Sequence, residues 1–262
     1  MRLMIKFEPT ESIKYSDIDK YTIQGFIYSL LKKDSSFSSL HDISGFKFFN
    51  FSNIFPVSDF EKNSLKKLII SSPNDEIIGS LYNQLKNKTS FKLKNHKMEL
   101  LKVMILKNND CSSFISATPI VLFEDNKKNR YYSFKQNPDF NFFFERLKDN
   151  AVKKYNAFYD CDFSLDSDLF TNFEFAREVS VRVNKNGNQF IVIGSLWKNL
   201  EFNLTSRNRD FYNFLFDNGL GEKNSLEIKV SDISCKSVSM FKIDLIVWKL
   251  LSWLKVFLVC MV

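Results

Sequence analysis

The stretch LKKLIISSPNDEIIGSLYNQL, residues 65–85, changes its apolar pattern from that of a strand to that of a helix. Its first part, residues 67–71, is a short apolar run rich in isoleucine, which favours a β-strand. Pro73 is suited to the start of a helix, and apolar residues recur at helical spacing after it, at Ile77, Ile78, Leu81 and Leu85. A strand followed directly by a helix indicates an α+β protein.

The sequence on either side completes a larger unit. Residues 1–7, MRLMIKF, alternate between the two faces of a half-buried strand. A helix is expected over residues 16–33, with Ser16 or Asp17 as its N-cap. Further strands are expected at residues 46–52 and 96–107. Together with residues 67–85, these elements give the order β-α-β-β-α-β, which is that of the ferredoxin-like fold.

The second half of the chain predicts the same order. A strand is expected at residues 113–123, a hairpin from REVSVRVN and NQFIVIGSL, a helix ended by Gly219, and a last strand in LEIKV. The long helix of residues 137–159 has a face spaced for burial, which consists of Phe144, Leu147, Ala151, Tyr155 and Phe158. The sequence therefore predicts an α+β chain with two tandem ferredoxin-like (RRM-like) domains, residues 1–112 and 113–232.

The remaining residues, 233–262, form an atypical hydrophobic tail. Asp244, Lys249 and Lys255 interrupt it, so it lacks the roughly 18 uncharged residues of a membrane span. A helix packed on the protein itself and a helix lying on a surface both remain open. At the other end, Arg2 and Lys6 exclude the apolar core of a signal peptide. A cytoplasmic protein is expected.

Composition favours a polyanionic partner. The net charge is +7 and the isoelectric point is near 9.0, while 44% of residues are hydrophobic, as in a globular protein. The four cysteines, at positions 111, 161, 235 and 260, contain no C-x₂₋₄-C pair, so no zinc site is expected.

Three side chains near the first helix could act together. His41 is one of two histidines, and it lies in a small polar loop where a proton-transferring group would be accessible. Lys47 follows on the next segment, and Tyr28 lies off the apolar face of the helix. These residue types suit metal-free phosphoryl transfer, in which histidine moves protons and lysine balances growing negative charge. Taken alone, His41 is better explained as a solvated loop residue.

The segment NGLGEKNS, residues 218–225, is a second candidate. Its glycines would let the backbone approach an anion, and Lys223 adds positive charge. It is not a Walker loop, and a helix C-cap glycine followed by a turn is the alternative reading.

These segments together resemble a known family. In order, GFIYSLL, LHDISGFKFFNFS, LIISSPNDEIIGSLYNQL, SATPIVLF and NGLGEKNS are similar to the CRISPR-associated endoribonucleases that process repeat RNA, within the repeat-associated mysterious protein superfamily. The resemblance covers residues 1–226. It stops where the family has a second glycine pair, because this chain continues with EIKV.

The resemblance implies an activity and a site. A metal-independent endoribonuclease without a cofactor would cleave CRISPR precursor RNA within its repeats, through 2′-hydroxyl attack, leaving a 2′,3′-cyclic phosphate and a 5′-hydroxyl. His41, Lys47 and Tyr28 fall on the family's catalytic positions. The RNA-binding positions of the glycine-rich loop fall on Gly219, Gly221 and Lys223.

Two other functions remain open at this point. One is a non-catalytic RNA-binding relative or a subunit of a CRISPR interference complex. The other is a ferredoxin-like binding protein whose tail attaches it to a partner or a membrane. The expected partner is CRISPR repeat RNA, with the interference complex as a further one. No DNA, membrane or metal is expected, and the chain would act as a monomer or homodimer.

Overall fold

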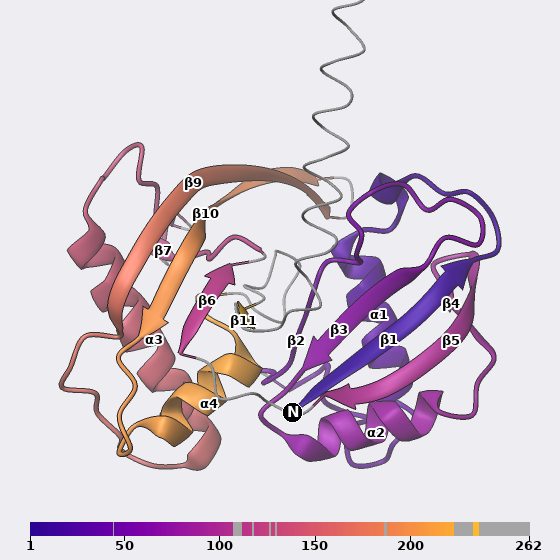
Figure 1. The fold of residues 1–262 in the computed structure, drawn as a ribbon, viewed down its shortest axis with the longest axis horizontal. Helices are drawn as coiled ribbons and strands as arrows, with labels where there is room; N and C mark the ends of the chain where they lie inside the picture. The colour runs from indigo at the N-terminus through magenta and orange to yellow at the C-terminus, as the bar shows by residue number, and fades with distance from the viewer. Residues whose placement is uncertain are drawn as a thin grey trace, which may run out of the picture.

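The computed structural model describes residues 1–43, 45–106, 112–116, 118–125, 127–128, 130–185, 188–222 and 233–235. Residues 1–106 form an N-terminal half, and the described residues from 112 onward form a C-terminal half (Figure 1). Both halves combine one main sheet with two α-helices, so the fold is α+β. The expected strand at 226–230, Lys223 and residues 236–262 of the tail lie outside the described residues.

The N-terminal half is a five-stranded sheet with the strand order β2-β3-β1-β5-β4. Strands β1, β3 and β5 are antiparallel neighbours. The elements of this half are β1 (Arg2–Pro9), a 3-10 helix (Tyr15–Asp17), α1 (Lys20–Leu31), β2 (Asn50–Phe51), β3 (Lys66–Ser71), α2 (Asp75–Leu85), β4 (Ser90–Leu93) and β5 (His96–Leu106).

The buried faces of the two helices in this half are those predicted from the sequence. The expected apolar residues of α1 and α2 are all buried in one core with alternate residues of β1, among them Ile27, Leu31, Ile78, Leu81, Leu3 and Ile5. The N-cap of α1, however, is Asp19, whose side chain accepts a hydrogen bond from the Thr22 amide at 2.8 Å. Helix α2 begins after Asn74, which caps the Glu76 amide. Each helix therefore starts two or three residues later than its sequence signal.

The strand expected at residues 46–52 is wrong over most of its length, because only Asn50–Phe51 pair with β3. Phe48 has a φ of 49°, in the left-handed region that does not continue a strand. Its ring packs on Phe158 and Phe214, with centroid distances of 5.0 and 6.5 Å. Packing against the C-terminal half therefore sets the backbone here.

The C-terminal half has a four-stranded sheet with the order β11-β6-β10-β9 and a separate β7-β8 hairpin. The expected strand at 113–123 is interrupted, and after Pro119 the chain rejoins β10 through paired hydrogen bonds between Ile120 and Ser195. The elements of this half are β6 (Ser113–Ser116), β7 (Phe123–Asp125), β8 (Arg130–Tyr131), α3 (Phe140–Tyr159), β9 (Phe170–Lys185), β10 (Asn188–Phe202), α4 (Arg209–Asn218) and β11 (Ile233–Cys235).

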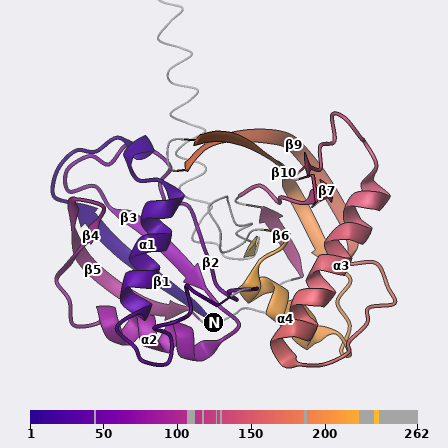
Figure 2. The same ribbon diagram turned by 180° about the vertical axis from the view of Figure 1, so that it is seen from behind.

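Helices cover one side of the two sheets. Seen from behind, α1 and α2 lie in front of the first sheet and α3 lies on the near side of the second, with α4 beside α3 at the lower edge (Figure 2). The fully buried residues of α3 are Phe143, Leu147, Ala151 and Lys154. Phe144, Tyr155 and Phe158, which were also expected on the buried face, are only partly buried. A lysine on this face was not expected.

Candidate active site and glycine-rich loop

The loop that carries His41 is a series of turns between α1 and β2. Backbone hydrogen bonds join the Phe37 amide to Asp34, the Leu40 amide to Phe37, and the Asp42 amide to Ser39. The side chains of Phe37 and Leu40 pack on the first core. The loop is therefore attached on one side by apolar contacts, and its polar side chains face outward.

His41 is an exposed residue of this loop, with 71% of its side chain accessible. Its Nδ1 lies 3.0 Å from Oδ1 of Asp42. In the tautomer with the proton on Nδ1, His41 donates to Asp42, and Nε2 is left to accept a proton from another molecule. The sequence analysis did not single out Asp42, although its position directly after the histidine was a usable signal.

Tyr28 lies against His41 from the side of α1. The ring centroids are 4.9 Å apart at an interplanar angle of 82°, and the tyrosine also meets Phe49 at 5.5 Å. Burial raises the pKa of Tyr28 to about 12. The hydroxyl therefore stays protonated at neutral pH and can act as a hydrogen-bond donor beside the imidazole.

Lys47 folds back onto the same loop. Its Nζ donates to the carbonyl oxygens of Leu40 at 2.9 Å and His41 at 3.1 Å, and also to that of Ile43. Gly45, with a φ of 96°, lies in the intervening turn and favours this reversal. The structure thus brings Tyr28, His41 and Lys47 together, whereas their catalytic roles stay predictions.

The glycine-rich segment lies at the end of α4 in the C-terminal half. Gly219 is the C-cap, with a φ of 79°, and its amide donates to Leu215 at 2.8 Å. Gly221 has a φ of 88°, and a Cβ at this position would lie 2.7 Å from the Val121 carbonyl oxygen. Both the dihedral angle and the close contact therefore require glycine at position 221.

The glycine-rich segment is held in place by charged side chains that are mostly buried. Lys154 of α3 is 4% exposed and its Nζ donates to the carbonyl of Gly221. Glu222 accepts from the Phe123 amide at 2.7 Å and from Arg146 at 3.2 Å. Burial lowers the pKa of Lys154 to about 7, against the opposing effect of the Glu222 charge.

The two segments differ in where they lie. His41, Tyr28 and Lys47 belong to the N-terminal half, and Gly219 and Gly221 belong to the C-terminal half. Phe48, next to Lys47, packs on Phe214 of α4 and thereby links them. The sequence analysis missed Lys154 and Glu222; the helical position of Lys154, three residues after the buried Ala151, was the available signal.

Two further observations on the described residues concern metal ions and membranes. No cluster of three or more His, Cys, Asp or Glu side chains among them is arranged to hold a metal ion. None of the helices in the described part of the chain is both long and apolar enough to cross a membrane.

Comparison with known proteins assigns the chain to a family. The model for CRISPR associated protein Cas6, C-terminal, matches residues 94–227. The chain is 42% identical over 238 residues to CRISPR-associated endoribonuclease Cas6 2 of Methanocaldococcus jannaschii, covering 86% of this chain and 96% of that protein.

Solved structures agree with this match. A CRISPR associated protein Cas6 is 25% identical with a TM-score of 0.63, over 88% of this chain and 98% of the other. A Cas6-related protein from Pyrococcus furiosus shares the fold, with 20% identity and a TM-score of 0.66 over 91% and 99% of the two chains. The chain therefore belongs to the Cas6 family of CRISPR-associated endoribonucleases.

Proposed function

We propose that this protein cleaves CRISPR precursor RNA within its repeats, without a metal ion, by attack of the 2′-hydroxyl upstream of the scissile phosphate. The proposal rests chiefly on the grouping of Tyr28, His41 and Lys47 on one loop and the helix before it. Its site would be the exposed imidazole of His41, since a substrate as large as RNA needs an accessible proton-transfer group.

Each of the three residues would have a separate role. His41 would act as the general base or acid through Nε2, with Asp42 holding the other ring nitrogen. Tyr28 would orient the substrate or donate a proton, because its hydroxyl is protonated. Lys47 would keep a positive charge beside His41 as negative charge grows on the phosphate oxygens.

The bonds of the reaction balance without a further reactant. The 2′-oxygen forms a bond to phosphorus and loses its proton, while the bond from phosphorus to the 5′-oxygen breaks. The leaving 5′-oxygen takes up a proton. The products are a 2′,3′-cyclic phosphate and a 5′-hydroxyl, and proton donor and acceptor can both come from the side chains named above.

Tandem ferredoxin-like domains are part of this proposal. The strand order β5-β1-β3-β2 of the N-terminal half places the last strand beside the first, and the first beside the third. The order β11-β6-β10-β9 of the C-terminal half follows the same rule. We take residues 1–112 as one domain and residues 113–232 together with β11 (Ile233–Cys235) as the other, each a β-α-β-β-α-β unit with small additions.

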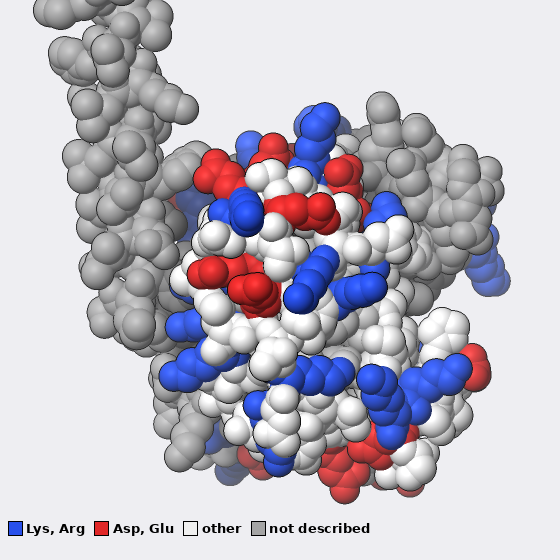
Figure 3. Space-filling view, turned by 90° about the vertical axis from the view of Figure 1, so that its right-hand side faces the viewer, with Lys and Arg blue, Asp and Glu red and all other residues white. Residues whose placement is uncertain are grey.

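Surface charge supports an RNA partner. The chain carries a net charge of +7, and four lysines of the β4-β5 hairpin are exposed, namely Lys92, Lys94, Lys97 and Lys102. Figure 3 shows the side of the N-terminal half where this hairpin lies, with basic side chains spread across it and acidic ones between them. Phosphate contacts would make binding weaker as salt concentration rises.

The decisive experiment incubates end-labelled repeat RNA with the protein in EDTA. His41→Ala should slow cleavage by about 10²- to 10⁴-fold, the range typical of a general acid or base. His96→Ala is the matched control, because the other histidine pairs with Glu11 at 2.6 Å and has no part in the proposed site. It should cleave at the wild-type rate.

A second substrate tests the nucleophile. RNA with a single 2′-deoxy nucleotide before the cut should bind but not be cleaved. Cleavage of that RNA, or full activity of His41→Ala, would contradict the mechanism. Binding of repeat RNA by the wild type without any cleavage would instead identify the protein as a non-catalytic relative.

A further inference from the structure

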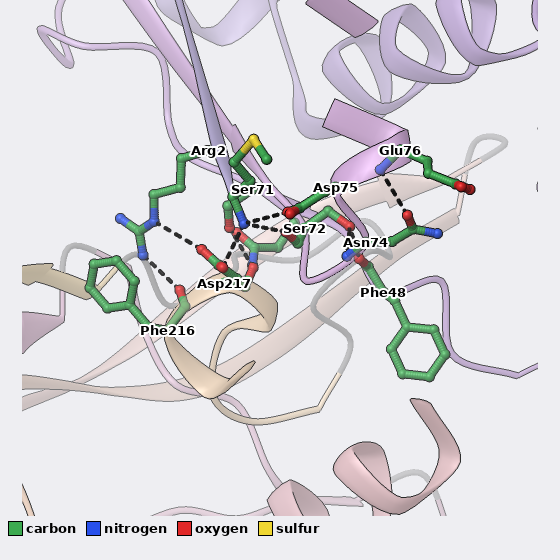
Figure 4. A network of polar contacts seen from close by, with 11 residues as sticks. Arg2, Phe48, Ser71, Ser72, Asn74, Asp75, Glu76, Phe216 and Asp217 are labelled. Carbon is green, nitrogen blue, oxygen red and sulfur yellow. Dashed lines mark hydrogen bonds and ion pairs between the residues drawn. The ribbon is translucent and has the colours of Figure 1, made fainter. Parts of the chain in front are cut away.

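The C-terminal end of α4 is joined to the N-terminal half by a buried group of polar contacts (Figure 4). Arg2 of β1 donates from Nη2 to the carbonyl of Phe216 at 2.7 Å, and its guanidinium lies 3.6 Å from the centre of the Phe216 ring. Its Nε is 3.9 Å from Oδ1 of Asp217. The side chains of Arg2 and Asp217 are only 11% and 10% exposed.

The backbone of Asp217 makes a second set of contacts with the same half. Its carbonyl oxygen accepts from Nδ2 of Asn50 at 2.9 Å and from Oγ of Ser71 at 2.5 Å. Asn50 and Ser71 face each other across the β2-β3 pair and are 2% and 1% exposed. We call Arg2, Asn50, Ser71, Phe216 and Asp217 the Asp217 cluster.

These contacts supply hydrogen-bond donors to backbone carbonyls at the C-terminal end of α4. The last carbonyls of an α-helix have no partner within the helix and carry partial negative charge. Here the carbonyls of Phe216 and Asp217 receive their donors from the other half of the chain. The cluster thus attaches the end of α4 firmly to the N-terminal sheet.

The cluster lies next to both segments of the candidate site. Gly219 follows Asp217 by two residues, and Asn50 follows Lys47 by three. Ser72, beside the cluster, donates to the carbonyl of Phe48 at 2.6 Å, and Phe48 packs on α4. Movement of α4 against β2 and β3 would therefore shift the glycine-rich segment relative to the His41 loop.

We propose that Arg2 and Asp217 are positioning residues for RNA cleavage, because the Asp217 cluster fixes the glycine-rich loop in register with the His41 loop. This proposal rests on the proposed function above. Charge-assisted hydrogen bonds that are shielded from water are strong and directional, so the cluster can define one relative placement. A displacement of about 1 Å in a bound substrate is enough to slow a reaction about a hundredfold.

The test compares two arginine substitutions of the same kind. Arg2→Met removes the donor to Phe216 and keeps much of the apolar side chain. Arg130→Met is the matched control, because Arg130 pairs with Glu124 at 2.6 Å within the C-terminal half. Asp217→Asn is a milder second variant, because it keeps the backbone carbonyl contacts and removes only the carboxylate charge that pairs with Arg2 and with the N-terminal ammonium of Met1.

The first readout separates rate from affinity and stability. Under single turnover with saturating RNA, Arg2→Met should cleave about tenfold or more slowly than wild type. Asp217→Asn should show a smaller loss, and Arg2→Lys should recover part of the rate by restoring a donor. Arg2→Met should unfold at a lower temperature than Arg130→Met, because the contacts of Arg2 are nearly buried and those of Arg130 are exposed, so both rates are measured well below either unfolding transition. A saturated rate equal to that of the wild type, or a loss shared with Arg130→Met, would overturn the proposal.

The second readout needs no cleavage. Spin labels are placed at Cys161 and at Lys92→Cys, which are exposed positions in different halves, with the other cysteines replaced by serine. The distance distribution between the labels should broaden in Arg2→Met and stay narrow in Arg130→Met. An unchanged distribution in Arg2→Met would overturn the positioning role. If wild-type protein cleaves no RNA, the proposed function fails, while the distances still decide whether the cluster aligns the two halves.

Discussion

The His41 loop and the glycine-rich loop are held in opposite ways. The His41 loop is attached by the apolar side chains of Phe37 and Leu40 and by one lysine that binds backbone carbonyls, and its histidine is largely exposed. In the glycine-rich loop, Leu220 and Gly221 are buried, and both Glu222 of the loop and Lys154, which contacts the loop from α3, are almost removed from solvent.

This difference fits the roles expected of the two loops, which are proton transfer for the His41 loop and RNA binding for the glycine-rich loop. A side chain that transfers a proton must reach its substrate, so an exposed loop with a few fixed contacts serves it well. A backbone segment that receives a phosphate must have its amides fixed in advance, because ordering them on binding would cost affinity. Damage to the glycine-rich loop should therefore weaken RNA binding, and damage to the His41 loop should slow cleavage.

Among three further substitutions, Gly221→Val should give the largest change. Backbone strain at a φ of 88° and a clash with the Val121 carbonyl would displace the loop, weakening the binding of uncleavable 2′-deoxy RNA about a hundredfold. Filter binding measures the dissociation constant. Gly79→Ala is the control, since a Cβ there meets nothing within 4 Å, and its affinity should not change. Wild-type affinity in Gly221→Val would remove this loop from the RNA interface.

Lys154→Met should have an intermediate effect. Loss of the hydrogen bond from Lys154 to the Gly221 carbonyl should weaken RNA binding about tenfold. The effect on stability should depend on pH. The pKa of Lys154 is about 7 in the folded protein, below its ordinary value of 10.5, so the unfolded chain binds the extra proton between these values.

The stability contributed by Lys154 therefore rises as pH increases from about 7 toward 10.5 and is lost as pH falls through 7. Denaturant unfolding at several pH values should show that the free energy of unfolding of the wild type increases relative to that of Lys154→Met from about pH 7 to about pH 10.5. A difference between the two proteins that is constant with pH would mean that Lys154 keeps an ordinary pKa.

Tyr28→Phe should give the smallest change. It keeps the ring contacts with His41 and Phe49 and removes only the hydroxyl, so cleavage should slow about threefold to tenfold, the value of one neutral hydrogen bond. Because the pKa of Tyr28 is about 12, the loss should be the same factor from about pH 6 to about pH 10. A loss that varies across that range in a pH–rate profile would indicate that the tyrosine titrates with the reaction.

The sequence predicted best what depends on local periodicity. The buried faces of α1 and α2 and of β1 are those expected, because each follows from apolar spacing alone. The grouping of Tyr28, His41 and Lys47 came from residue type and resemblance, and the structure brings these residues side by side.

The parts that sequence reasoning did not reach depend on distant contacts. Phe48 leaves the strand because its ring packs on Phe158, which is 110 positions away in the sequence. Lys154 occupies a buried helix position because its amine donates to the carbonyl of Gly221 and interacts with the charge of Glu222. Neither partner can be recognised from the local pattern around the residue.

The separation in sequence between Arg2 and Phe216 has a consequence for synthesis on the ribosome. All strands of the first sheet lie within residues 2–106, so this half can fold while the rest of the chain is still being translated. The contact between β1 and α4 spans 214 positions and can close only after α4 has emerged. A nascent chain would thus display a folded first sheet well before the His41 loop is aligned with its partner, and RNA processing would begin only on completed molecules.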